Sequence, residues 1–280
     1  MVIPIVILKG GIKMAVTHFQ QTIWSKKIQD ALELKCKLVD NCTREYEGDC
    51  KYANTVKILA VGDPTIGQYT GADITIEEMT DASQLLPIDQ ANYFAFMVDD
   101  VDKAQSVPGL PEKFQAKAVH GLAVKRDAYV ANLIKSGTNV TTAAGNTQAD
   151  IKKAIDDAIV ALRERNFDEE AVIEISPAVY STFKNELVEL KTANDELIKK
   201  GVVGMYDNMK VIMTNGLAND GSHVYCAVRG TKAIAFCGQI NEVEAGRMER
   251  RFADYIRGLD TFGSKVIDNE RLQVVKVPVA

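Results

Sequence analysis

A strand followed by one long helix, within residues 85–135, constrains the fold more than any other part of the chain. Phe94, Phe96 and Val98 keep the period of two that is typical of a strand. Aromatic and β-branched residues favour the same structure. A group of acidic residues then ends the apolar pattern. The first part of this stretch therefore predicts a strand that leads into a helix.

The second part predicts a single helix that ends near Lys135. Pro111 stands where a first helical residue is expected, and Glu112 follows it in the first turn. The apolar residues that share one helical face are Phe114, Ala118, Leu122, Tyr129, Val130 and Leu133. Lys135 gives a basic last turn, and Gly137 predicts a left-handed stop. Such a helix would be ~35 Å long at a rise of 1.5 Å per residue, which is long for an enzyme domain and suits a structural spine.

The bulk composition is that of a folded protein without basic or membrane-spanning character. The chain has 280 residues, of which 46% are apolar and 25% charged, and its net charge is −5. This length allows one large domain or two ordinary ones. The acidic balance argues against a dedicated nucleic-acid binder, and no apolar run reaches the ~18 residues of a membrane span. The five cysteines include no CxxC pair, which favours reduced thiols over a disulfide framework or a zinc site.

The first residues have an unusual order, because the apolar residues come before Lys9 and Lys13. A signal peptide has the opposite order and ends in small residues. The KGG sequence at residues 9–11 can be encoded by a bacterial ribosome-binding sequence, a short distance before the Met14 codon. We therefore expect Met14 to be the true start and residues 1–13 to be a mistranslated leader; the alternative is a real N-terminal tail.

Two extended features are predicted before the long helix. Residues 17–38 mix polar and apolar side chains at helical spacing, which predicts an amphipathic arm with Trp24 as a packing anchor. Residues 55–61 and 73–77 then predict the two strands of a long hairpin, with glycine and proline between them. The hairpin contains no large apolar cluster, so we expect it to lean on another part of the assembly, such as a second subunit.

A small polar linker at residues 136–148 predicts a crossing between domains. Thr147 then begins a helix, with Asp150 three residues on as in a capping box. The elements that follow are a strand at 171–175, a helix capped by Ser176 and Pro177, and strands at 209–214, 223–228 and 232–237. Residues 147–238 therefore predict an α+β subdomain inserted after the linker.

The C-terminal stretch contains two conflicting patterns. The residues that are spaced as in a helix are Met248, Phe252, Tyr255, Ile256 and Leu259. Beyond Gly263, residues 265–267 and 272–277 predict strands.

No group of residues forms a catalytic signature. The chain lacks the GxGxxG, GxxxxGK[ST], GxSxG and HExxH motifs. Its three histidines, His18, His120 and His223, stand in separate predicted elements, and His120 is expected to be a packing residue rather than a base. No catalytic, cofactor-binding or metal-binding residue is predicted, and we do not expect an enzyme.

Two charged clusters have more than one interpretation. The acids Asp99, Asp100 and Asp102 could hold a hard cation, but a cluster before a helix is usually solvated or complements the helix dipole. The one basic concentration consists of Arg247, Arg250, Arg251, Arg257 and Lys265. Because Glu242, Glu244, Glu249 and Asp254 are interleaved with it, a subunit ion-pair network is favoured over a phosphate site.

Four stretches resemble the major capsid proteins of tailed bacteriophages. The opening of those proteins is similar to MAVTHFQQTIWSKKI at 14–28, and their hairpin region to ANTVKILAVGDPTIGQYTGADITIEEMTD at 53–81. The strand and turn before their spine helix resemble LPIDQANYFAFMVDDVDKAQ at 86–105, and their C-terminal return resembles RMERRFADYIRGLDTFGSKVIDNERLQVVKV at 247–277. The order and spacing of the four stretches carry the resemblance, which covers nearly all of residues 14–280.

The resemblance implies an α+β fold of the Hong Kong 97 capsid type. It places an N-terminal arm at 14–52, an extended loop that overlaps a neighbouring subunit at 53–83, a peripheral domain with the spine helix at 84–140 and 239–280, and an axial domain at 141–238. It also implies extended strand for much of residues 247–260, and we follow the resemblance there rather than the helical spacing noted above.

The implied function is that of a coat protein. Such a protein self-assembles as pentamers and hexamers into an icosahedral shell, which encloses double-stranded DNA and contacts it non-specifically. The resemblance further implies a separate scaffolding protein, a portal, assembly in the bacterial cytoplasm, a place in the virion capsid and no membrane partner. An encapsulin-like nanocompartment shell is the alternative, and a small enzyme of unknown reaction is the third hypothesis; fold alone does not separate the first two.

Overall fold

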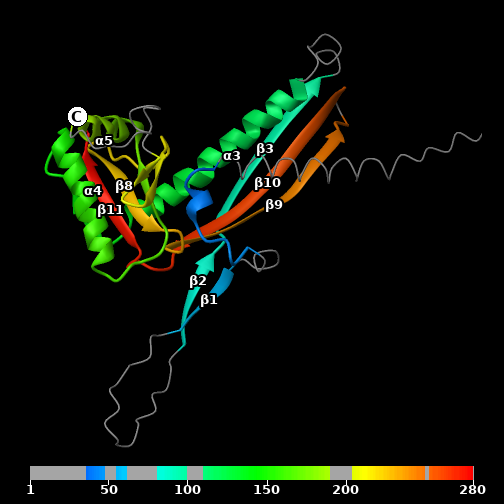
Figure 1. Cartoon of the computed structure of the whole chain (residues 1–280). Helices are drawn as coiled ribbons and strands as arrows, with labels where there is room; N and C mark the ends of the chain where they lie inside the picture. Colours follow the sequence, from blue (N-terminus) through cyan, green and yellow to red (C-terminus); the bar gives the residue numbers. More distant parts are fainter. Residues whose placement is uncertain are drawn as a thin grey trace, which may run out of the picture.

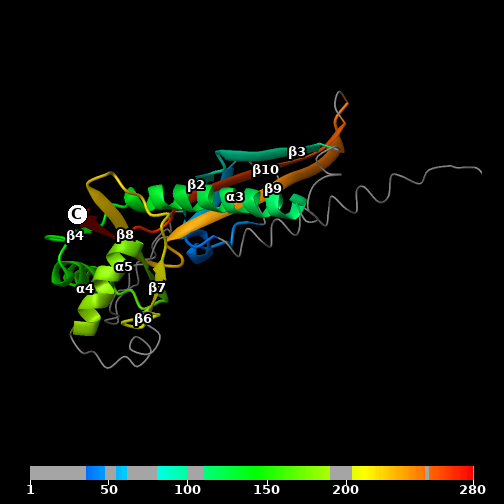
Figure 2. The same cartoon turned by 90° about the horizontal axis from the view of Figure 1, so that it is seen from above.

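Helix α3 (Leu110–Lys135) connects two sheets of different size in the computed structural model (Figure 1). The structure describes residues 36–47, 55–61, 81–99, 110–189, 204–249 and 252–279. The helix begins within one residue of Pro111 and ends at Lys135, so the predicted spine is confirmed. Its N-terminal part lies along an elongated three-stranded sheet, and its C-terminal end reaches a six-stranded sheet (Figures 1 and 2).

The elongated sheet has the strand order β3-β10-β9, and both pairings are antiparallel. Its strands are β3 (Gln90–Asp99), β10 (Ala253–Val266) and β9 (Ile234–Arg247). Figure 2 shows that α3 lies on one side of this sheet. Phe96 of β3 contacts Phe114 of α3 with ring centroids 5.7 Å apart, and Tyr129 of α3 meets Phe262 of β10 edge to face at 5.6 Å. The period of two in β3 therefore separates a helix-facing side from an outer side.

The six-stranded sheet has the order β4-β11-β8-β5-β7-β6. Its strands are β4 (Val140–Thr142), β11 (Leu272–Pro278), β8 (His223–Gly230), β5 (Ala171–Ile175), β7 (Met209–Met213) and β6 (Met205–Tyr206). Every residue of β5 is buried, which fits a strand covered on both faces. The C-terminal strand β11 is hydrogen-bonded to both β8 and β4, so the end of the chain completes this sheet.

Helices α4 (Gln148–Arg163) and α5 (Pro177–Glu189) pack on the six-stranded sheet. The Thr147 hydroxyl accepts a hydrogen bond from the Asp150 N–H, so the predicted N-cap is confirmed. The buried face of α4 consists of Ile151, Ala154, Ile155, Ala158, Ile159 and Leu162. The Ser176 hydroxyl likewise accepts from the Val179 N–H at the start of α5. Local capping therefore starts both helices, and their apolar faces fix them to the sheet.

A two-stranded hairpin, β1 (Thr55–Val61) and β2 (Asp81–Pro87), projects from the body of the molecule (Figure 1). The first strand is the predicted one. The second lies at residues 81–87, whereas the predicted partner, residues 73–77, falls outside the described residues. The base of the hairpin is held by the Lys265 ammonium, which donates to the Leu85 carbonyl at 3.0 Å.

The extended strand that the resemblance implied for the C-terminal stretch is confirmed, whereas the predicted left-handed stop at Gly137 is wrong. Tyr255, Ile256 and Leu259 lie in β10 and do not form the helix that their spacing alone suggests. Pairing with β3 on one side and β9 on the other overrides the local spacing. Gly137 does not have a positive φ. Its small size is needed instead for close packing, since a Cβ there would lie 2.7 Å from a methyl group of Val274.

The N-terminal part that the structure describes includes a short 3-10 helix, η1 (Val39–Asn41), instead of the end of a longer helical arm. This helix lies beside α3 and the six-stranded sheet, and Thr43 forms a parallel bridge to Ala235 of β9. The rest of the predicted arm, residues 17–35, lies outside the described residues.

Candidate assembly surfaces

The described histidines stand apart from each other. His120 is exposed on α3, and His223 lies on β8 with its Nδ1 3.7 Å from Asp220, so these two histidines are not brought together. Across the described ranges, no group of three or more His, Cys, Asp or Glu residues could hold a metal ion. Asp99 ends β3, whereas Asp100 and Asp102 lie outside those ranges, as does His18.

The predicted ion-pair network is present in part, on strands β9 and β10. Arg257 donates from Nε to a Glu244 carboxylate oxygen at 2.7 Å, and the two residues are directly opposite each other in the ladder. Donation from Arg257 holds the pKa of Glu244 below its ordinary value. Arg247 lies 3.8 Å from Asp254. Arg250 and Arg251 lie outside the described residues.

The outer side of the three-stranded sheet, away from α3, exposes large apolar side chains. Tyr93 is 80% exposed, Met97 52% and Leu259 39%. Tyr93 and Leu259 are partners across the β3–β10 ladder, so they form one continuous surface. We call Tyr93, Met97 and Leu259 the outer apolar face. Exposed apolar side chains gathered on one side of a sheet make this side a candidate site of interaction with another macromolecule.

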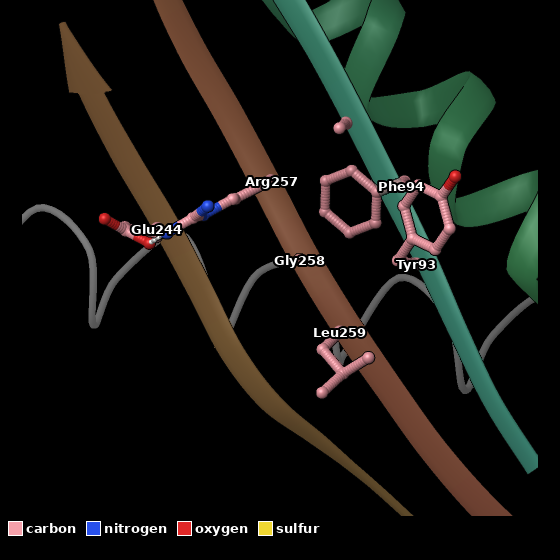
Figure 3. Close-up of a pocket in the computed structure, with 7 residues that line it drawn as sticks. Tyr93, Phe94, Glu244, Arg257, Gly258 and Leu259 are labelled. Carbon is pink, nitrogen blue, oxygen red and sulfur yellow. Dashed lines mark hydrogen bonds and ion pairs between the residues drawn. The ribbon is translucent and has the colours of Figure 1, made fainter. Parts of the chain in front are cut away.

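A shallow depression of about 400 Å³ lies on the outer apolar face (Figure 3). Its walls are Tyr93 and Leu259, and Figure 3 shows the Arg257–Glu244 pair at its border. Phe94, Ala95 and Gly258 complete its lining, and glycine at 258 allows the Phe94 ring to lie close to β10, because a Cβ there would overlap that ring. The depression therefore combines an apolar floor with a fixed charged rim, as protein–protein interfaces do.

The described core of the projecting hairpin lies at its base. Val56, Ile58 and Leu86 are buried against Ala235 and Cys237 of β9. Leu85, by contrast, is 56% exposed. An isolated two-stranded hairpin is marginal in water, so a projecting hairpin needs contacts from outside its own subunit.

A buried ion pair fixes α3 to the elongated sheet. The Arg126 guanidinium donates from Nε to the Asp260 carboxylate at 3.0 Å, and its second bond to the same carboxylate makes the contact bidentate. Both side chains are buried. The guanidinium also lies 5.4 Å from the centre of the Phe236 ring and 5.8 Å from that of Phe262. This arrangement holds the long helix at one rotation relative to the sheet.

A second buried ion pair fixes η1 to the six-stranded sheet. Arg229 of β8 donates to both oxygens of Glu174 in β5, at 3.0 and 2.8 Å, and neither side chain is exposed. The same guanidinium donates to the carbonyls of Leu38 and Asn41. The contacts with these two carbonyls hold the N-terminal segment against the sheet, while the ion pair with Glu174 joins β8 to β5.

Asp127 of α3 completes the attachment of the N-terminal segment. Its carboxylate accepts hydrogen bonds from the backbone N–H groups of Lys37, Leu38 and Val39. Burial of this carboxyl nevertheless raises its pKa above the ordinary value. The segment at residues 37–41 is therefore joined to both the helix and the six-stranded sheet.

The prediction of reduced thiols is confirmed for Cys36, Cys42 and Cys226 and is wrong for Cys237. Cys36, Cys42 and Cys226 are free and buried, and burial raises the pKa of Cys36 and of Cys226 to about 12. Thiols in this state are poor nucleophiles and metal ligands. Cys237, in contrast, is disulfide-bonded.

Sequence reasoning missed the two buried ion pairs and the outer apolar face. Glu174 and Arg229 read as ordinary charged positions in strands, and their pairing appears only once the strands are placed side by side. Tyr93 and Met97 gave a detectable signal, because β3 is apolar on both of its sides. No helix among the described residues is long and apolar enough to cross a membrane.

Comparisons with known proteins give a fold but no sequence family. No protein-family model matches the chain, and no curated protein matches it. A chain from Mycobacterium phage Che8 is similar with a TM-score of 0.73 and 23% identity, over 86% of this chain and 90% of that one. A chain from the capsid structure of the cyanophage P-SCSP1u has a TM-score of 0.68 and 15% identity, over 81% and 84% of the two chains.

A third similar structure is a virus-like particle from Pyrococcus furiosus, with a TM-score of 0.57 and 12% identity over 91% of this chain and 99% of that one. The match extends over most of each compared chain, so it is not limited to one shared motif. The chain therefore has the α+β fold of phage capsid subunits.

Proposed function

We propose that this chain is the major capsid protein of a tailed bacteriophage or prophage, and that it self-assembles into an icosahedral shell around packaged double-stranded DNA. The similarity of fold over 86% of this chain to a phage structure, at a TM-score of 0.73, carries the proposal. Because fold alone does not define function, surfaces suited to assembly are the second support.

The projecting hairpin and the outer apolar face supply such surfaces. Both leave apolar surface exposed in the isolated subunit: among the described residues, Leu85 of the hairpin is 56% exposed, and Tyr93 of the outer apolar face is 80% exposed. The hairpin of one copy covering the sheet of a neighbour would bury both. The contact joins different surfaces of two copies, so it can close into rings, as pentamers and hexamers require.

The proposed parts of the subunit follow the capsid fold. Residues 14–52 would be the N-terminal arm, 53–83 the extended loop, 84–140 and 239–280 the peripheral domain, and 141–238 the axial domain near the symmetry axes. A separate scaffolding protein and a portal would act in assembly in the host cytoplasm, and the mature location would be the virion capsid. We propose a structural role without catalysis.

A nanocompartment shell is the second candidate, because the virus-like particle from Pyrococcus furiosus has a similar fold. Such a shell would enclose a cargo protein in place of a genome. Genes for a portal, a terminase and a scaffold beside this one would favour the phage function, and a gene for a cargo enzyme would favour the compartment.

Electron microscopy of the expressed chain, alone and with its neighbouring genes, tests the proposal. We expect closed particles of uniform curvature, with DNA inside when the packaging genes are present. A folded monomer or dimer that never assembles, even with a scaffold, would contradict the proposed function. Particles that enclose a protein cargo and exclude DNA would support the second candidate instead.

A further inference from the structure

The exposed charges of helix α3 all have the same sign in the part whose side chains are described, residues 114–135. The exposed charged residues there are Lys117, Lys125 and Lys135, and His120 is exposed beside them. The other two charged residues of this part, Arg126 and Asp127, are buried and bonded within the subunit. This uniform positive charge contrasts with the net charge of −5 of the whole chain.

The three lysines extend along much of the helix. Lys117 and Lys135 are separated by five turns of 3.6 residues, so they lie on the same side, about 27 Å apart along the axis. Lys125 lies between them, about 80° around the helix. Figure 2 shows that α3 lies on one side of the three-stranded sheet, so its opposite side is not covered by that sheet.

A fourth lysine continues this positive surface beyond the helix. Lys276 of β11 and Lys135 lie 5.9 and 5.1 Å from the centre of the same ring, that of Tyr225 in β8. Tyr225 and Lys276 are direct partners in the β8–β11 ladder. We call Lys117, Lys125, Lys135 and Lys276 the basic ridge.

The described structure contains no anion partner for the basic ridge. None of its four lysines forms an ion pair with a described carboxylate. Asp220, which contacts the hydroxyl of the same Tyr225, also accepts hydrogen bonds from the N–H groups of Ser222 and His223. Like charges gathered without a partner raise the local potential, and an external polyanion lowers it.

We propose that the basic ridge contacts the phosphodiester backbone of DNA without sequence preference. This inference rests on the proposed shell function, because that function brings many copies of the ridge and one long polyanion together. Duplex DNA carries a charge about every 1.7 Å, so a ridge about 27 Å long can meet several phosphates. Lysines act as point charges that need no fixed phosphate geometry, and many weak contacts add through multivalency.

The test measures binding of unassembled subunits to a short duplex of mixed sequence as a function of sodium chloride. We expect the triple variant Lys117→Gln, Lys125→Gln, Lys135→Gln to bind at least about tenfold more weakly at low salt, with a salt slope smaller by about 2–3. The matched control Lys153→Gln, Lys184→Gln, Lys232→Gln removes three surface lysines elsewhere and should bind as the unmodified chain does. The charge-keeping variant with arginine at 117, 125 and 135 should also bind.

Three results would overturn the inference: no binding by the unmodified chain, an equal loss in the control, or an equal loss in the arginine variant. If the triple variant does not fold, Lys125→Gln alone should still lower the slope by about 1, and an unchanged slope would count against the ridge. Particle formation is recorded for the same samples. Normal shells with no DNA binding would overturn only the inference that the basic ridge binds DNA. A failure to form shells would overturn the proposed function.

Discussion

The two sheets of this molecule are covered to different extents. Strand β5 of the six-stranded sheet is buried along its whole length, whereas β3 of the three-stranded sheet has α3 on one side only and leaves Tyr93 80% exposed on the other. Each region also contains one buried arginine–carboxylate pair, Arg229–Glu174 and Arg126–Asp260 respectively. If the proposed function holds, the three-stranded region is the part of the subunit that we expect a neighbouring copy to cover.

The largest effect is expected from Glu174→Ala, in the six-stranded region. The substitution leaves the Arg229 guanidinium buried without its counter-charge, which should lower the free energy of unfolding by about 3–5 kcal/mol. Urea denaturation measures the change. Glu170→Ala, at an exposed glutamate before β5, should change stability by less than about 0.5 kcal/mol. An equal effect of the two variants would show that the buried pair does not hold this region.

A smaller loss, of about 2–3 kcal/mol, is expected from Asp260→Asn in the three-stranded region. The Arg126 guanidinium would lose its carboxylate but keep the faces of Phe236 and Phe262, which offset part of the cost. The same denaturation experiment compares the two regions directly. A loss equal to or greater than that of Glu174→Ala would mean that the rings give no such compensation.

Tyr93→Ala should separate folding from assembly. Because Tyr93 is exposed in the subunit, its removal should change the free energy of unfolding by less than about 0.5 kcal/mol. Loss of an aromatic anchor at an interface should raise the subunit concentration needed for particles by about tenfold or more, as light scattering can measure. Val160→Ala, at an exposed apolar residue on α4, is the control. If both variants impair assembly equally, the distinction between the two regions fails.

The effect that is smallest at neutral pH concerns the alkaline stability of the six-stranded region. Burial raises the pKa of Cys226 from the ordinary value of 9.0 to about 12, so the folded state favours the neutral thiol. The stability that this group contributes is fully present below pH 9.0 and is lost as the pH rises toward about 12. Cys226→Ala should therefore make the decline of stability over this pH window shallower. Denaturation at several pH values measures this decline. Val228→Ala shrinks a neighbouring buried residue without removing a thiol, and it should keep the steeper decline.

Local patterns in the sequence predicted the elements whose structure is decided locally. Pro111 and the apolar stripe predicted α3, and the Thr147–Asp150 pair predicted the start of α4. Cap residues and apolar periodicity act within one or two turns, so they can be read without knowledge of the remaining fold.

Features that depend on distant partners could not be read in the same way. Ile256 and Leu259 share helical spacing, yet in β10 they lie on opposite sides of a sheet whose partner strand β3 is far away in the sequence. The pairing of Arg229 with Glu174 depends on the β5–β8 register in the same way. The outer apolar face was missed because the alternation in β3 was interpreted as one buried side and one solvent-exposed side. A strand that contacts a helix on one side and a partner on the other has apolar residues on both sides.

The most direct test of the central claim is a cryo-EM reconstruction of the assembled particle. The account predicts a closed icosahedral shell in which the β1–β2 hairpin of one copy covers Tyr93, Met97 and Leu259 of its neighbour. A shell that leaves the outer apolar face open to solvent, or a chain that remains a folded monomer under all assembly conditions, would contradict it.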